Sequence, residues 1–321
     1  MIRFGIIGAG GIATKFASDI KFVQNAKLVA VASRTHKKAI AFKEKFNIEY
    51  AFESYEEMAK SDLIDAVYVA IPHNFHKEVS IMCMNHKKHV LCEKPIAVNA
   101  EEFEEMVISS KKNEVLLMEA MWTKFLPVTK KVREVVISNE LGALKHTYLE
   151  FGQNITGLGG DVGRWFNFNL AGGSLLDMGV YPIAYTLNLT EIPVKSIKAK
   201  AQFYHTGIDT VCEVDIVFED DSTATLVSSF LETKNKPGII EFEKGTIIVD
   251  DFWESQRVSI NGKVYDYPHI GQGFPYQIEA FSDTIEKGLL ENDLMTHDQT
   301  RKSMELLDRI REIIGLKYPF E

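Results

Sequence analysis

The sequence has few cysteines, no long hydrophobic run and no excess of positive charge, and each shortage narrows the class of protein. The three cysteines, Cys83, Cys92 and Cys212, are odd in number and lack metal-ligand spacing, so they argue against a disulfide framework and against a metal site. No apolar stretch approaches the roughly 18 residues that a membrane span needs. The net charge of −9 argues against nucleic acid as a partner.

Composition places the chain among ordinary globular proteins. Its 321 residues are 45% hydrophobic and 25% charged, and this length suggests about two domains, each large enough for its own core. Buried thiols in a reducing compartment are the expected state of the cysteines, so we expect a cytoplasmic protein.

A glycine loop follows the first apolar strand. The strand at residues 2–7 runs into Gly8-Ala9-Gly10-Gly11-Ile12-Ala13, a G-x-G-x-x-A pattern that is typical of dinucleotide sites. Gly8 permits a tight turn, Gly10 lets the backbone approach a pyrophosphate, and Gly11 and Ile12 open a helix whose free N–H groups face the phosphates. Glycines also serve ordinary turns, so the loop alone leaves that alternative open.

The end of the next strand bears on the choice of cofactor. Residues 28–32 are expected to form the second strand of a βαβ unit, and an NAD site usually places an acid just after it. Here Ser33 and Arg34 stand there instead, with Lys38 close behind. Hydroxyl and cationic groups suit a 2′-phosphate, so the sequence favours NADP over NAD. The alternative is a solvated helix start.

The order of apolar segments predicts two domains of different construction. Residues 1–122 alternate strand and helix signals, which indicates a doubly wound parallel sheet of Rossmann type, with the uniformly apolar residues 66–71 as a central buried strand. Later segments alternate apolar and polar residues without helices between them, namely 196–203, 213–218 and 223–230. We therefore expect an α/β fold whose second part, residues 123–321, is an α+β domain with a large, mostly antiparallel open sheet.

In open α/β sheets the ligand lies outside the carboxyl ends of the strands, so the residues that end the strands are the candidates for chemistry. Lys94 lies between an acid and a proline at such an end, where desolvation lowers the pKa of a lysine and fits it for proton transfer. Its bond to Pro95 has an appreciable chance of being cis. A solvated strand-end lysine is the alternative. The predicted cofactor contacts at these ends are Pro72, His73, His76, Glu93 and Lys94 itself.

The second domain offers a matching segment from Gly172 to Pro182. Its glycines precede an apolar helical stretch in which Asp177 and Tyr181, at i and i+4, share one face. A phenol beside a lysine ammonium has a lowered pKa and becomes a usable acid or base. Alone, the tyrosine could be packing and the acid a satisfied buried group, so the pair matters only if it faces Lys94.

These motifs together resemble the Gfo/Idh/MocA oxidoreductases over nearly the whole chain. The stretches that carry the resemblance are Gly8 to Ala13, Pro72 with His76, His89 to Pro95, Glu119 to Trp122 and Gly172 to Tyr181. The resemblance implies that Lys94 lies beside the nicotinamide and the substrate hydroxyl, and that Asp177 and Tyr181 match the D-x-x-x-H positions. It also suggests a homodimer formed through the open sheet.

One departure from the family pattern points to a branch. Tyr181 stands where most sugar and inositol dehydrogenases of the family have His, which is similar to the dihydrodiol dehydrogenase and glucose-fructose oxidoreductase branch. There the tyrosine is the acid or base, the lysine supports it, and the cofactor is commonly NADP. The candidates for the substrate pocket are Trp122, Arg164 and Trp165, although a packed tryptophan is an equally good interpretation.

The sequence therefore predicts reversible hydride transfer between NADP and a small secondary alcohol or its ketone, of sugar, polyol or trans-dihydrodiol type. The catalytic residues are expected to be Lys94, Asp177 and Tyr181, and the proton acceptor is open between Lys94 and Tyr181 because a close pair titrates as a unit. Two rivals remain: a non-catalytic NADP-sensing regulator of the same fold, and a redox enzyme acting on a double bond, as in a tetrapyrrole.

Overall fold

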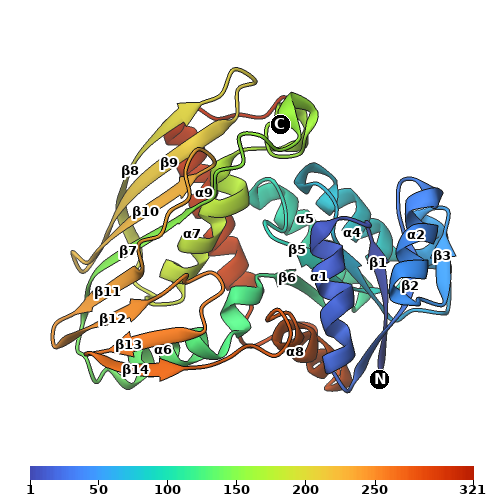
Figure 1. The fold of residues 1–321 in the computed structure, drawn as a ribbon, viewed down its shortest axis with the longest axis horizontal. Helices are drawn as coiled ribbons and strands as arrows, with labels where there is room; N and C mark the ends of the chain where they lie inside the picture. The colour runs from blue at the N-terminus through green and yellow to red at the C-terminus, as the bar shows by residue number, and fades with distance from the viewer. The chain divides into compact units, whose positions relative to one another are not determined.

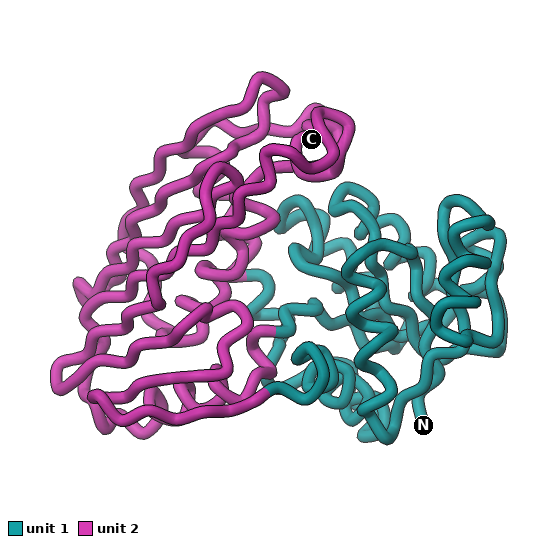
Figure 2. The backbone as a smooth tube through the Cα atoms, viewed as in Figure 1, with its two compact units in different colours: residues 1–122, 269–301 teal, residues 123–268, 302–321 magenta.

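The computed structural model describes all 321 residues, which form two compact units. Figure 2 shows unit 1, residues 1–122 and 269–301, in teal and unit 2, residues 123–268 and 302–321, in magenta. The segment 269–301 thus groups with the N-terminal residues, whereas the sequence placed a single boundary after residue 122. Packing contacts decide which segments belong to one structural unit, and no local sequence pattern reveals those contacts.

Unit 1 is built on a six-stranded sheet in the order β3-β2-β1-β4-β5-β6 (Figure 1), and every neighbouring pair is parallel. The strands are β1 (Ile2–Ile7), β2 (Ala26–Ala32), β3 (Tyr50–Phe52), β4 (Ala66–Val69), β5 (His89–Glu93) and β6 (Leu117–Ala120). The expected doubly wound sheet is confirmed. As its uniform apolarity predicts, β4 lies between β1 and β5 and is wholly buried.

Helices alternate with these strands. They are α1 (Gly11–Asp19), α2 (His36–Phe46), α3 (Tyr55–Lys60), α4 (His76–Asn85), α5 (Ala100–Asn113) and, from the distant segment, α8 (Pro275–Glu286), with short 3₁₀ turns η1 (Ile20–Phe22) and η2 (His73–Phe75). The Ser54 hydroxyl caps α3 by accepting from the Glu57 N–H at 3.1 Å. The Asp19 carboxylate at the end of α1 accepts from the backbone of Gln272 at 2.7 Å and of Phe274 at 3.2 Å, which ties the distant segment into unit 1.

Unit 2 contains an eight-stranded sheet in the order β14-β13-β12-β11-β7-β10-β9-β8. All neighbours are antiparallel except β7 and β10. The strands are β7 (Leu144–Gly152), β8 (Val194–Phe203), β9 (Asp209–Phe218), β10 (Thr223–Ser229), β11 (Gly238–Phe242), β12 (Gly245–Val249), β13 (Arg257–Ile260) and β14 (Lys263–Asp266). The mostly antiparallel open sheet is confirmed, and β7 and β11 to β14 add to the three strands the sequence indicated.

Helices cover one face of the second sheet, where α7 lies across the strands (Figure 1). The remaining helical elements of the chain are η3 (Trp122–Phe125), α6 (Pro127–Ser138), the 3₁₀ turns η4 (Gly160–Val162) and η5 (Phe168–Leu170), the π-helix η6 (Leu175–Gly179), α7 (Val180–Leu187) and α9 (His297–Ile314), of which η3 and α9 begin in unit 1 and continue into unit 2. Along β9, Cys212, Val214 and Ile216 are buried while Asp215 is exposed, so the strand alternates as expected.

None of the helices of the chain has the length and apolarity required to cross a membrane. The three cysteines are unbridged and buried.

Candidate active site

The glycine loop after β1 forms the turn that its pattern predicts. Gly8 has a φ of +103°, and a Cβ there would lie 2.3 Å from the carbonyl oxygen of Ala70, so only glycine fits. A Cβ on Gly10 or Gly11 would meet no protein atom within 4 Å. These two glycines therefore face open space, which leaves the backbone accessible to a bulky ligand.

The helix that follows the loop is free to bind an anion at its N-terminus. Gly10 occupies the N-cap of α1, no side chain caps the helix, and its first turn, where Ile12 lies, contains no acid. The unpaired N–H groups and the positive end of the helix dipole suit a pyrophosphate. The residues present therefore fit the dinucleotide that the loop pattern indicates.

The end of β2 also leads into a helix that no side chain caps. Thr35 does not cap α2 with its side chain, and the first turn of α2 is basic, with Lys37 and Lys38 and no acid. Ser33 is buried and Arg34 is exposed. The hydroxyl of Tyr55 is hydrogen-bonded by the Arg34 backbone, and burial raises the pKa of that phenol. A cationic, uncapped helix start of this kind fits the 2′-phosphate of NADP.

The turn after β5, which contains Lys94, is fixed from several sides. The buried Glu93 carboxylate accepts a hydrogen bond from the Tyr68 hydroxyl on β4. The Glu119 carboxylate on β6 accepts from the Ile96 N–H at 3.1 Å. The Lys94–Pro95 peptide bond is cis, and Lys94 is only 9% exposed. This lysine is thus a buried group on a rigid turn, as the desolvation hypothesis requires, and its role in catalysis stays a prediction.

The imidazole of His76 joins two of the strand ends. Its Nδ1 lies 2.9 Å from the Pro95 carbonyl oxygen, and its Nε2 lies 2.8 Å from that of Ile71. A carbonyl oxygen only accepts, so a neutral ring donates to one of them and an imidazolium to both. His76 is fully buried, and the ring of His73 lies 5.7 Å from it, centroid to centroid. The geometry gives His76 a bracing function, and its predicted cofactor contact stays a prediction.

In unit 2, Asp177 lies within the π-helix η6 and Tyr181 at the start of α7. Both are buried, at 7% and 8% exposure. Asp177 Oδ1 forms an ion pair with Arg164 Nη1 at 3.3 Å, and the Arg164 guanidinium lies 4.8 Å from the ring centroid of Trp165. A π-helical turn is uncommon and is frequently found at functional sites. The sequence predicted an ordinary helix here, because nothing local separates the two helix types.

An aromatic ring packs against the tyrosine and is itself stacked on a second ring. The Phe151 ring meets that of Tyr181 edge to face at 5.3 Å and stacks on that of Trp253 at 4.2 Å. Phe151 and Trp253 come from β7 and from the loop after β12, and no motif marked either of them. By contrast, Trp122 is 4% exposed and stacks on Phe274 within unit 1, so its substrate contact stays a prediction.

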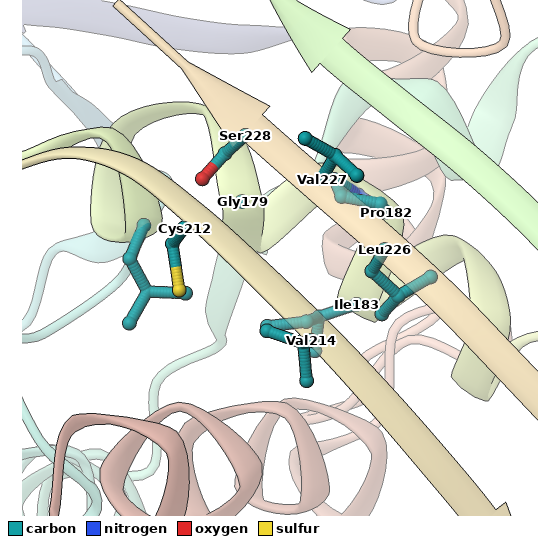
Figure 3. A pocket seen from close by; sticks show the side chains of 9 residues that line it. Gly179, Pro182, Ile183, Cys212, Val214, Leu226, Val227 and Ser228 are labelled. Atoms are coloured by element: carbon teal, nitrogen blue, oxygen red, sulfur yellow. The ribbon is translucent and has the colours of Figure 1, made fainter. Parts of the chain in front are cut away.

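A small cavity lies where η6 and α7 pack on the sheet (Figure 3). It measures about 10 Å³, which is at most the space of one water molecule. Its lining is mostly apolar and comes from Leu175, Gly179, Pro182, Ile183, Cys212, Val214, Leu226, Val227 and Ser228. The cavity is therefore a packing gap beneath the helix and not a substrate site.

Two positions that support the site could have been found in the sequence. Tyr68 and Glu119 are polar residues within short, otherwise apolar buried strands, and a buried polar group needs a partner. The partner of Tyr68 is Glu93, which ends β5, and the partner of Glu119 is the Ile96 N–H in the turn that follows β5.

A parallel sheet with an open glycine loop, two uncapped helix starts and a buried lysine at its carboxyl edge defines a dinucleotide-dependent enzyme. A family model described as "Oxidoreductase family, NAD-binding Rossmann fold" matches residues 2–121, and one described as "GFO/IDH/MocA C-terminal domain" matches residues 129–249. The chain belongs to this Gfo/Idh/MocA family of oxidoreductases.

Relatives of known function are similar over the full length. The chain is 35% identical to scyllo-inositol 2-dehydrogenase (NADP(+)) IolU of Bacillus subtilis, covering 99% of both chains. It is 32% identical to trans-1,2-dihydrobenzene-1,2-diol dehydrogenase of Xenopus tropicalis, again covering 99% of both. Among solved structures, an aldose-aldose oxidoreductase from Caulobacter crescentus superposes with a TM-score of 0.88 at 22% identity, covering 98% of this chain and 97% of that one, and shares the fold.

Proposed function

We propose that the protein catalyses reversible hydride transfer between NADP and a secondary alcohol or its ketone on a sugar, polyol or trans-dihydrodiol. The observation that carries this proposal is Tyr181, buried beside Asp177 at a π-helical turn, where the dihydrodiol dehydrogenase branch has its acid or base. Relatives with full-length similarity include one NADP-dependent inositol dehydrogenase and several dihydrodiol dehydrogenases. They are enzymes, which favours catalysis over a regulatory role.

We assign each predicted binding residue to one part of the cofactor. Backbone groups of Gly8, Gly10, Gly11 and Ile12 bind the pyrophosphate, and Ser33, Arg34 and Lys38 bind the 2′-phosphate. Pro72, His73, His76 and Glu93 are assigned to the nicotinamide half. When bound, the nicotinamide donates or accepts the hydride.

Tyr181 and Lys94 act on the hydroxyl proton of the substrate. The proton acceptor is open between Tyr181 and Lys94, because a phenol and an ammonium that act on the same hydroxyl titrate as a pair. Asp177, held by Arg164 at 3.3 Å, orients the substrate hydroxyl or the ammonium. Trp122, Arg164 and Trp165 are assigned to the substrate, with Trp165 available for stacking on a ring.

Replacing the phenol tests this assignment. Tyr181→Phe should lower kcat by about 10² or more and leave NADPH affinity, measured by fluorescence titration, unchanged. The control is Tyr185→Phe, which removes a hydroxyl one turn further along the same helix, where the side chain is 2% exposed. Full turnover in Tyr181→Phe would refute the proposal.

A substrate panel separates the rivals. NADP reduction and NADPH oxidation are followed with polyols including inositols, with sugars, with trans-dihydrodiols and with dicarbonyls. Turnover with one of these classes supports the proposal. Tight NADP binding with no turnover on the whole panel would favour the regulator, and turnover confined to a conjugated double bond would favour the tetrapyrrole-type enzyme.

We also propose a cytoplasmic homodimer formed through the outer face of the second sheet. Three reduced, buried cysteines suit a reducing compartment. Apolar side chains remain exposed on β12 and on the edge strand β14, with Ile248 at 39% and Val264 at 53%, while the opposite end of the sheet has charged groups such as the Lys200–Glu213 pair at 2.9 Å. A monomer in sedimentation equilibrium at micromolar concentration would contradict the dimer.

A further inference from the structure

The carboxyl group of Asp209 is buried in unit 2 and has no part in the proposed reaction. Asp209 is the first residue of β9, and its exposure is 0%. Burying a carboxylate has a large desolvation cost, which specific hydrogen bonds to the carboxylate must offset. Its partners therefore indicate what it does.

Both partners of Asp209 lie at the start of η6. One carboxylate oxygen, Oδ2, accepts from the Ser174 hydroxyl at 2.7 Å and from the Leu175 N–H at 2.7 Å. The Ser174 oxygen is also 3.0 Å from the Ser228 hydroxyl on β10. The other oxygen, Oδ1, lies 2.2 Å from where a Cβ on Gly173 would be, and Gly173 has a φ of +128°. The carboxylate thus packs directly against the turn that precedes η6.

The same turn is connected to the proposed catalytic residues. The Gly173 carbonyl accepts from the Asp177 N–H at 3.2 Å, and the Gly173 N–H donates to the Trp165 carbonyl at 3.0 Å. On the other side, the Tyr318 hydroxyl donates to the Gly172 carbonyl at 2.7 Å. Any shift of this turn moves the backbone of Asp177, and Tyr181 follows one turn later.

The buried setting of Asp209 disfavours the charged form of its carboxyl group. Burial raises the pKa of Asp209 to about 6, and the hydrogen bonds from Ser174 and Leu175 offset only part of that rise. The ionisable groups facing it are the thiol of Cys212 on its own strand and the phenol of Tyr318, and the Asp209 charge helps to raise the pKa of each. Arg311 on α9 lies over the Tyr318 ring, 5.4 Å from its centroid, and its charge opposes the rise in the pKa of that phenol.

We propose that Asp209 is a positioning residue, whose carboxylate holds the Gly173–Ser174 turn and the first N–H of η6 so that Asp177 and Tyr181 are aligned for proton transfer. This inference rests on the proposed function of those two residues. It assigns the buried acid a role through the helix and not through contact with substrate. A misaligned acid or base lowers the rate of the chemical step with little effect on cofactor binding.

Asp209→Ala and Asp209→Asn test the role. We expect Asp209→Ala to lower kcat about tenfold or more while the Kd for NADPH changes less than about twofold, because the glycine loop is in unit 1. Asp209→Asn keeps one oxygen that can accept from Ser174 and Leu175, so it should recover part of kcat. The matched control is Asp215→Asn on the same strand, where the carboxylate is exposed and accepts from Thr225 at 2.8 Å.

Two further readouts separate positioning from a general loss of structure. In the wild type kcat should fall as pH drops through about 6, where Asp209 takes up a proton, and Asp209→Asn should lack that limb. Hydrogen exchange at the Leu175 amide should be faster in Asp209→Ala than in the control. If the alanine variant does not fold, Ser174→Ala, which removes one donor to the carboxylate, gives the same comparison.

The outcomes distinguish this inference from the proposed function. A folded Asp209→Ala with wild-type kcat, or an acid limb that persists unchanged in Asp209→Asn, overturns the positioning role. Full turnover in Tyr181→Phe overturns the proposed function instead. Low turnover in both Tyr181→Phe and Asp209→Ala, with NADPH affinity retained, supports both.

Discussion

The buried charge of Asp209 predicts a specific dependence of stability on pH. Its pKa is raised from the ordinary 3.8 to about 6 by burial. Below about pH 4 the carboxyl is protonated in the folded and unfolded chain alike, whereas between about 4 and 6 only the unfolded chain loses the proton. The contribution of this group is therefore full at low pH and is lost as pH rises through about 6. The total loss is about 3 kcal/mol of unfolding free energy, at about 1.4 kcal/mol per tenfold change in proton affinity.

Urea unfolding of the wild type and of Asp209→Asn measures this effect. The other carboxyl and histidine groups titrate alike in the two proteins, so the difference in unfolding free energy isolates Asp209. Between about pH 4.5 and about pH 7.5 we expect the Asn variant to gain about 2 kcal/mol relative to the wild type. A difference that stays constant over this range would refute the argument that burial raises this pKa.

Two further predictions concern the cofactor site. Gly8→Ala should lower the thermal midpoint and abolish NADPH binding, because the new Cβ would lie 2.3 Å from the Ala70 carbonyl oxygen. Gly10→Ala should fold normally and only weaken binding, since its Cβ meets no protein atom within 4 Å. Equal thermal midpoints for the two variants would contradict this reasoning. Arg34→Ala should weaken binding of NADP about tenfold to a hundredfold and leave NAD binding nearly unchanged, because it removes a charge-assisted contact to the 2′-phosphate. Lys43→Ala, in the last turn of α2, is the control. An equal loss of affinity for both cofactors would exclude the assigned contact.

Local chemistry explains why so much of unit 1 could be predicted. The turn at Gly8 needs a positive φ, Ser54 caps α3, and β4 is apolar on both faces. Each of these elements is therefore specified by its own residues. The missing acid after β2 is likewise a local observation. The strand ends then follow from the rule that parallel strands share one carboxyl edge.

Unit 2 was less predictable because half of its strands are short and because β7 pairs with strands that lie far along the chain. The strands β11 to β14 have four or five residues each, which is too short for alternation to be diagnostic. Phe151, which contacts Tyr181, comes from β7, and Trp253, which stacks on Phe151, comes from a loop about 70 residues after Tyr181, so no spacing could reveal them. The boundary after residue 122 likewise misses the return of residues 269–301 to unit 1.

The sequence by itself determined the parallel nucleotide-binding sheet and the glycine turn, and it singled out Lys94, Asp177 and Tyr181 as the proposed catalytic residues, because each depends on backbone geometry or on a short motif. Only the tertiary structure decided which groups hold those residues in place. His76 reaches the Pro95 and Ile71 carbonyls, and Asp209 reaches the start of η6 from 34 residues away. Hydrogen bonds between distant segments have no periodicity along the chain, so they become visible only when the chain is folded.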